Sequence, residues 1–242
     1  MNERRLSVTN SLIIINVVVF VVGLLAQRPA VLGISYPGGA PTSVFEVLGA
    51  YSWFSSFMQW EVWRVISYQF VHANFGHLLF NMWALYFFGP AVEDAMGPRK
   101  YLAYYLICGV AGALFSSLLS LLGFYSPGNS MLIACNELAA YTGFVGMVEV
   151  WQMIPLIGAS ASLYGVMIAT AYMYPEAQIS LLFPPVTLKL RTFALCVVGI
   201  ASFIILFNLD NAGGEAGHLG GILMGAFIMS IWKFRQRNRL PW

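Results

Sequence analysis

The chain has 242 residues, of which 59% are hydrophobic and 9% are charged, and its formal net charge is +2. Soluble domains contain about 45–50% apolar and about 25% charged residues, so this composition excludes an ordinary soluble domain and indicates a polytopic membrane protein. The sequence has no basic patch with interleaved aromatic residues, so no nucleic-acid partner is expected. Short connections oblige the segments to pack on one another, which predicts a single all-α domain over residues 1–242.

Apolar runs predict six membrane-spanning helices, because a bilayer core of about 30 Å requires about 20 helical residues. Residues 27–75 form a long connection after the first span, and its second half is rich in aromatic residues, as expected for chain in the lipid headgroup region. Residues 123–157 are interpreted as a loop that carries a short surface helix. The predicted spans cover residues 8–26, 76–92, 98–122, 159–174, 190–206 and 217–232.

The distribution of basic residues predicts the orientation of these spans. With both termini in the cytoplasm, ten of the twelve Lys and Arg residues lie on the cytoplasmic side, and Arg28 and Arg64 lie outside. This bias follows the positive-inside rule. We therefore expect a multi-pass protein of the cell inner membrane, with the starts of the second, fourth and sixth spans on the outer side. Those starts carry His77, Ser160 and His218.

Small residues recur at helical spacing in the fourth and sixth spans. Ala161 and Gly165 share one face, and Gly217, Gly221 and Gly225 share another. Such ridges let two helices approach closely in lipid, and packing alone would explain them. The close approach would also bring Ser160 and His218 together, since both lie at the outer ends of their helices.

A serine hydroxyl becomes an effective nucleophile only when a base takes its proton, and His218 is the candidate base for Ser160. An ionisable residue within a membrane span is costly, which favours a functional role for His218. The nearest carboxylate, Glu215, falls in the loop predicted before the sixth span. We therefore expect a serine–histidine pair and not a three-residue arrangement.

Amide hydrolysis also requires hydrogen-bond donors for the developing oxyanion. His77 and Asn81 are four residues apart, hence on one helix face, and the backbone N–H of Ser160 near a helix N-terminus would be a third donor. The alternative for His77 and Asn81 is an inter-helix hydrogen bond that holds the bundle together. Tyr164 could pack against the ring of His218 or be an ordinary core tyrosine, and a structural or surface role is expected for His72.

Several short motifs occur together in this order along the chain: Trp63-Arg64, His77-xxx-Asn81, Gly89-Pro-Ala-Val-Glu93, Gly158-Ala-Ser160, Tyr164 and Ala216-Gly-His218-Leu-Gly-Gly221-xxx-Gly225. In this combination they resemble the rhomboid intramembrane serine proteases over nearly the whole chain. The glycine that commonly follows the serine in that family is replaced here by Ala161, whose methyl group could crowd the oxyanion site or the helix contact.

The resemblance implies a six-helix bundle with Ser160 as nucleophile and His218 as general base in a water-filled cavity that opens outward. It implies that His77, Asn81 and the Ser160 amide form the oxyanion hole, and that Tyr164 and Gly158 belong to the same oxyanion and substrate-binding set. Implied substrates are single-pass membrane proteins of the lipid bilayer, cut in or near their membrane helix, with no metal or cofactor. Alternatives are an inactive member of the same fold that binds and escorts membrane proteins, and a small transporter or channel.

Overall fold

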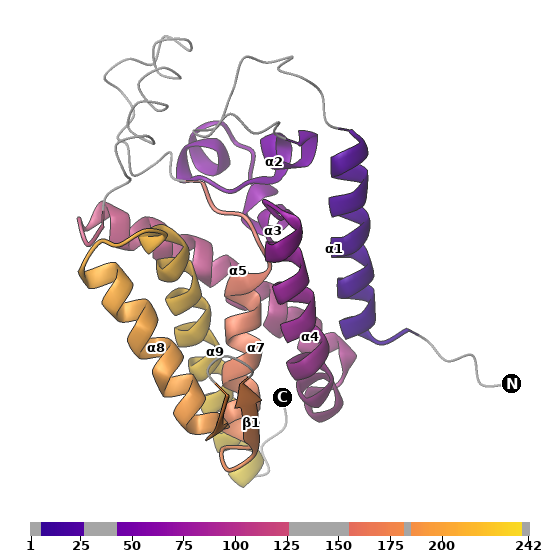
Figure 1. Cartoon of the computed structure of the whole chain (residues 1–242), viewed down its shortest axis with the longest axis vertical. Coiled ribbons are helices and arrows are strands. Elements are labelled where there is room, and N and C mark those ends of the chain that lie inside the picture. The colour runs from indigo at the N-terminus through magenta and orange to yellow at the C-terminus, as the bar shows by residue number, and fades with distance from the viewer. Residues whose placement is uncertain (1–5, 27–42, 126–154, 182–184, 239–242) are drawn as a thin grey trace, which may run out of the picture.

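The computed structural model describes residues 6–26, 43–125, 155–181 and 185–238. Within these residues, upright helices form a bundle with the short helices α2 and α3 at one end and a β-hairpin at the other (Figure 1). The surface helix predicted between residues 123 and 157 falls largely outside the described residues. The elements are α1 (Val8–Leu25), α2 (Val44–Gly49), η1 (Phe54–Met58), α3 (Arg64–Ser67), η2 (Tyr68–Phe70), α4 (Phe75–Met96), α5 (Pro98–Leu121), α7 (Ser160–Met173), β1 (Gln178–Leu181), β2 (Val186–Lys189), α8 (Leu190–Leu206) and α9 (Ala212–Asn238).

The helix bounds follow local signals in the sequence. The Ser7 side chain caps α1 by accepting a hydrogen bond from the backbone N–H of Asn10. Gly97, with φ of 81°, ends α4, and Pro98 then begins α5 at a position where its missing N–H has no cost. In the described part of the chain, α1, α5 and α9 are long and apolar enough to cross a membrane, and α8 is a shorter apolar helix.

The start of α9 differs from the sequence prediction. Residues 208–216 were expected to form a glycine-rich loop, whereas the helix begins at Ala212. Asn208 and Asn211 make the turn from α8 with φ values of 46° and 66°, a conformation that asparagine tolerates better than most residues. The reversal is thus complete before Gly213, and Glu215 lies in the first helical turn.

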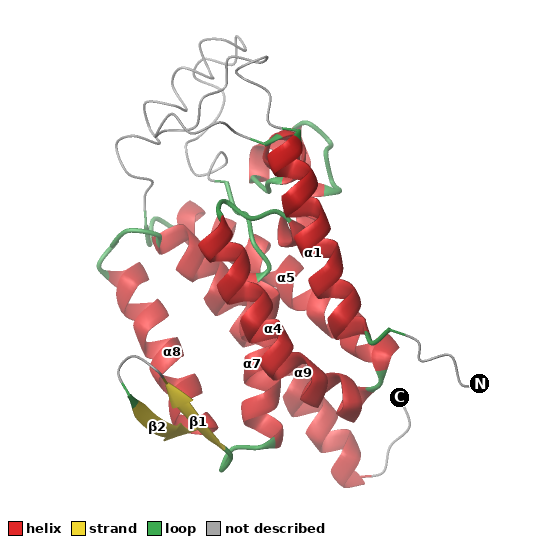
Figure 2. Ribbon diagram, turned by 45° about the vertical axis from the view of Figure 1, so that its right-hand side comes forward, coloured by secondary structure: helices red, strands yellow, loops and turns green. Residues whose placement is uncertain are grey.

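A second difference is the hairpin between α7 and α8, in a segment predicted to be a loop. Strands β1 and β2 pair antiparallel, with Gln178 opposite Lys189 and Leu181 opposite Val186 (Figure 2). The two strands contain the β-favouring residues Ile179, Val186 and Thr187. Pro185 directly precedes β2, and a proline beside a strand end removes no hydrogen bond from the pairing.

Helix α7 is the most buried helix of the bundle and packs against α4, α5, α8 and α9, and α9 in turn packs against α5, α7 and α8. The predicted contact between the small-residue faces of α7 and α9 is confirmed. A Cβ on Gly221 would overlap the backbone carbonyl of Ala161, and a Cβ on Gly225 would lie 3.0 Å from the Cα of Gly165. Gly112 of α5 is equally confined, because its Cβ would lie 2.6 Å from the carbonyl oxygen of Gly217. Backbone therefore meets backbone along α9, which fixes the position of that helix.

The segment before α4 is folded and is attached to the chain that leads into α7. Tyr51 and Leu156 exchange two backbone hydrogen bonds, of 3.0 and 2.8 Å. The Gly158 N–H donates to the Tyr68 carbonyl at 2.9 Å. Arg64 is buried and donates from Nη1 to the Ala50 carbonyl at 2.9 Å. Leu156 and Gly158, in the irregular chain ahead of Ser160, thus form backbone hydrogen bonds with the segment before α4, which positions the start of α7.

Glu93, near the end of α4, caps the start of α1. Its carboxylate accepts from the N–H of Val8 at 2.6 Å, and from the N–H and hydroxyl of Thr9 at 2.9 and 2.7 Å. The first N–H groups of a helix have no partner within the helix, so a buried carboxylate there satisfies groups that would otherwise be desolvated without compensation. Glu93 therefore joins α1 to α4 at the end of the bundle opposite α2.

We expect Glu93→Ala to lower the free energy of unfolding by about 2–4 kcal/mol, because hydrogen bonds to a buried charged group contribute about 1.5–3 kcal/mol each and are not fully additive. Denaturant titration of the detergent-solubilised protein measures this loss. The control is Asp94→Ala, which removes the neighbouring exposed carboxylate. Equal stability of the two variants would show that the Glu93 contacts do not anchor α1.

Candidate active site

Ser160 and His218 lie in contact at the ends of two tightly packed helices. Ser160 is the first residue of α7 and is only partly buried. His218 lies in the second turn of α9, and its Nε2 is 2.8 Å from the Oγ of Ser160. This is the distance at which an imidazole nitrogen can take a hydroxyl proton.

The ring of His218 is also held on its face. The Tyr164 ring stacks on it with the ring centroids 4.2 Å apart and the planes inclined by 7°. Tyr164 lies one turn after Ser160 on α7, so one helix supplies both the hydroxyl and the surface against which the imidazole rests. Of the two roles considered for Tyr164, packing against His218 is therefore the one that the structure supports.

A carboxylate contacts the other nitrogen of His218, contrary to the expected two-residue arrangement. Glu215 Oε2 lies 3.1 Å from His218 Nδ1, and both side chains are largely buried, with 15% and 13% exposure. The expectation was wrong because α9 begins earlier than predicted. Once residues 212–218 are helical, Glu215 and His218 are three residues apart and share a face.

His77 and Asn81 of α4 approach the backbone just before Ser160. The Asn74 side chain caps α4 by accepting from the His77 N–H at 2.9 Å. A Cβ on Gly158 would lie 2.6 Å from His77 Nε2 and 3.6 Å from Asn81 Nδ2, so only glycine fits there, and its φ of 116° also requires glycine. Among the described residues, the buried Asn81 Nδ2 has no hydrogen-bond partner. Two side-chain donors are thus directed to the chain beside the serine.

The methyl group of Ala161 faces α5. A Cβ added to Gly112 would lie 2.6 Å from the Ala161 Cβ, and Ala161 is 4% exposed. The glycine on α5 therefore provides the space that the alanine on α7 occupies. This contact lies on the α5 side of α7, whereas His77 approaches Gly158 from α4.

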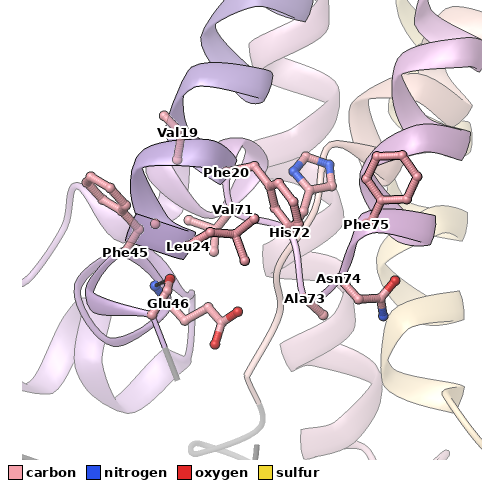
Figure 3. A pocket seen from close by; sticks show the side chains of 12 residues that line it. Val19, Phe20, Leu24, Phe45, Glu46, Val71, His72, Ala73, Asn74 and Phe75 are labelled. Atoms are coloured by element: carbon pink, nitrogen blue, oxygen red, sulfur yellow. Dashed lines mark hydrogen bonds between the residues drawn. The ribbon is translucent and has the colours of Figure 1, made fainter. Parts of the chain in front are cut away.

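His72 lies beside His77 and lines a separate cavity. The two imidazole rings meet edge to face, with centroids 5.0 Å apart. His72 is 4% exposed, so the surface role considered for it is wrong. A cavity of about 320 Å³ lies between α1, α2 and the residues before α4, with Phe20, Glu46 and His72 among its walls (Figure 3). His72 is thus packed between this cavity and His77.

Burial and the neighbouring His77 lower the pKa of His72 from 6.5 to about 3. Between pH 6.5 and pH 3, His72 is therefore protonated in the unfolded chain but remains neutral in the folded chain. Protonation thus favours the unfolded state, and the free energy of unfolding decreases as the pH falls through this range. Between pH 7 and pH 5 we expect the contribution of His72 to lower the free energy of unfolding by about 2 kcal/mol. Denaturant titrations of wild type and His72→Gln at both pH values measure it. A loss of equal size in the variant would contradict the assignment to His72.

In this bundle of apolar helices, His218 contacts the hydroxyl of Ser160 through one ring nitrogen and the carboxylate of Glu215 through the other. This arrangement is typical of the active sites of serine hydrolases. The chain belongs to the rhomboid family, because the model of the Rhomboid domain matches residues 59–234. This range includes Ser160, His218, His77 and Asn81. The family membership also makes the apolar bundle a membrane bundle.

Individual relatives are similar at low identity. Rhomboid protease AarA of Providencia stuartii is 28% identical over 168 residues, which are 69% of this chain and 54% of that protein. Rhomboid protein 1, mitochondrial, of Saccharomyces cerevisiae is 29% identical over 180 residues, 72% of this chain and 44% of that protein. Inactive RHOMBOID-like protein 8 of Arabidopsis thaliana is 31% identical over 80 residues, 33% of this chain and 23% of that protein. The chain spans about half the length of the first two relatives. One of these relatives is named inactive, so membership of the family does not by itself establish catalytic activity.

Proposed function

We propose that the chain is an intramembrane serine endopeptidase that cleaves single-pass membrane proteins in or near their membrane helix. The observation that carries the proposal is the 2.8 Å contact between Ser160 Oγ and His218 Nε2. Inactive scaffolds of the same fold need neither group. The close backbone packing of Gly221 on Ala161 further supports a chemical role, since it holds the two side chains at a set separation.

The reaction begins with attack of Ser160 Oγ on the carbonyl carbon of the scissile amide, while His218 Nε2 takes the hydroxyl proton. The carbonyl oxygen becomes an oxyanion, for which the Ser160 N–H, His77 and Asn81 are the donors. The carbon–nitrogen bond then breaks, and His218 returns its proton to the leaving amine. Water, deprotonated by the same imidazole, hydrolyses the serine ester and regenerates the hydroxyl.

In the same proposal, residues 1–242 form one domain with six membrane spans, α1, α4, α5, α7, α8 and α9. Both termini lie in the cytoplasm, and the site opens to the outer side of the cell inner membrane through a water-filled cavity. The count of ten basic residues inside and two outside supports this orientation.

The test uses the whole chain reconstituted in phospholipid vesicles with a panel of single-pass membrane proteins that carry small residues near one end of the helix. We expect cleavage products whose termini, determined by mass spectrometry, lie in or near the membrane helix. A fluorophosphonate should modify the wild-type protein at Ser160, with loss of fluoride, and should not modify Ser160→Ala. A protein that neither cleaves any substrate nor reacts with the fluorophosphonate would contradict the proposal of an active protease.

A further inference from the structure

Resting on the proposed function, we infer that Glu215 is a positioning residue that holds His218 in the tautomer required to activate Ser160. A neutral imidazole carries one proton, so Nε2 can accept from the serine only when that proton is on Nδ1. Glu215 Oε2 is 3.1 Å from Nδ1 and can accept a hydrogen bond only from the protonated nitrogen. The carboxylate thereby leaves Nε2 free for the 2.8 Å contact with Ser160.

Tyr164 and Glu215 constrain different degrees of freedom of the same ring. The stacked phenol, inclined by 7°, fixes the plane of the imidazole but does not distinguish its two nitrogens. The carboxylate lies at the ring edge and distinguishes them. Both are needed, because a ring in the correct plane with its proton on Nε2 would donate to Ser160 and could not take its proton.

The location of Glu215 strengthens its effect. It lies in the first turn of α9, where the unpaired N–H groups favour a negative charge. With 15% of the side chain exposed, its interaction with an imidazolium is less screened than a surface pair would be. When His218 takes the serine proton, the new positive charge forms next to this carboxylate and is stabilised by it.

Few other charged or titratable groups face the ring. Tyr164 reaches it from α7, and the His77 imidazole of α4 is close enough to interact with it electrostatically. On α5, Arg99 and Lys100 lie about 20 Å along the helix from Gly112, the residue that meets Gly217. Glu215 is thus the carboxylate that contacts His218 in the described part of the chain.

The experiment measures kcat and KM for Glu215→Ala and Glu215→Gln in vesicles, with Asp210→Asn as the matched control. Asp210 is an exposed carboxylate in the turn before α9. We expect Glu215→Ala to lower kcat about tenfold to hundredfold with KM changed less than twofold. Glu215→Gln should lose at least as much activity as Glu215→Ala, because its amide –NH2 can donate to an unprotonated Nδ1 and so favour the wrong tautomer. The same change from carboxylate to amide in the triad of a soluble serine protease costs roughly 10⁴-fold in kcat. Asp210→Asn should match wild type.

The role through His218 is tested by combining substitutions. In a His218→Ala background, Glu215→Ala should leave the residual rate of fluorophosphonate labelling of Ser160 unchanged, since there is no imidazole to orient. A further loss in that background, or equal kcat for wild type and both Glu215 variants, would overturn the inference. If wild type itself neither cleaves nor is labelled, the proposed function fails, which is a different result. A Glu215→Ala protein that does not fold leaves Glu215→Gln to decide between these outcomes.

Discussion

Replacing His218 with alanine is expected to lower the rate of substrate cleavage at least about a thousandfold without unfolding the protein. Removal of the histidine base in a soluble serine protease costs about 10⁶ in kcat, and the residual rate comes from binding and the oxyanion donors. Nε2 at 2.8 Å is the base that contacts the Ser160 hydroxyl in the described structure, so no neighbouring side chain there is placed to substitute for it. The measurement is cleavage of a single-pass substrate in vesicles, followed by gel analysis over a range of times.

Two comparisons make the His218 result interpretable. Ser160→Ala should reduce the rate to a similar extent, and the double variant should be no slower than either single one, because the two residues act as a unit. The thermal melting temperature of each variant in detergent should stay within a few degrees of wild type, because the truncated groups are only partly buried. Cleavage by His218→Ala within tenfold of the wild-type rate would remove the proposed mechanism.

Gly221→Ala should both destabilise the protein and lower its activity about a hundredfold. The added methyl group would overlap the carbonyl of Ala161, so α9 must move away from α7. Overpacking a tight contact costs about 1–3 kcal/mol. Gly221 lies one turn after His218 on α9, and a displacement of about 1 Å in a catalytic group can cost about 10² in rate. Melting temperature and kcat are measured together in the same preparation.

The matched control is Gly199→Ala on α8, where a Cβ would meet nothing within 4 Å. Alanine is favoured over glycine within a helix by about 1 kcal/mol, so this variant should be slightly more stable than wild type and equally active. Glycine-to-alanine substitution is therefore expected to lower the stability of the protein at position 221 and to raise it slightly at position 199. If both glycines respond alike, the contact between α7 and α9 does not determine the geometry of the site.

Much of this arrangement could be predicted from periodic small residues and apolar runs. The faces containing Ala161 and Gly221 predicted a close helix contact, because in lipid only small side chains allow backbones to approach. The meeting of Ser160 with His218 followed from their common position at helix ends. These features depend on local spacing, which a single sequence records directly.

The features that were not predicted from the sequence are the start of α9, the β-hairpin and the burial of His72. The first two depend on where the backbone changes direction. Two consecutive glycines at 213 and 214 favoured a loop, but the reversal is made by asparagines before them, and Glu215 was therefore assigned to the wrong element. The β-hairpin between α7 and α8 was not predicted because two adjacent prolines, Pro184 and Pro185, are typical of a loop. The burial of His72 depends on the packing of His77 and on the walls of α1 and α2, which are distant in sequence.

The pairing of Tyr51 with Leu156 has a mechanical consequence. Two backbone hydrogen bonds connect Tyr51, in the folded segment before α4, to Leu156, which lies just ahead of Ser160 in the chain that enters α7. A displacement of the Tyr51 segment is therefore transmitted through these bonds to the start of α7.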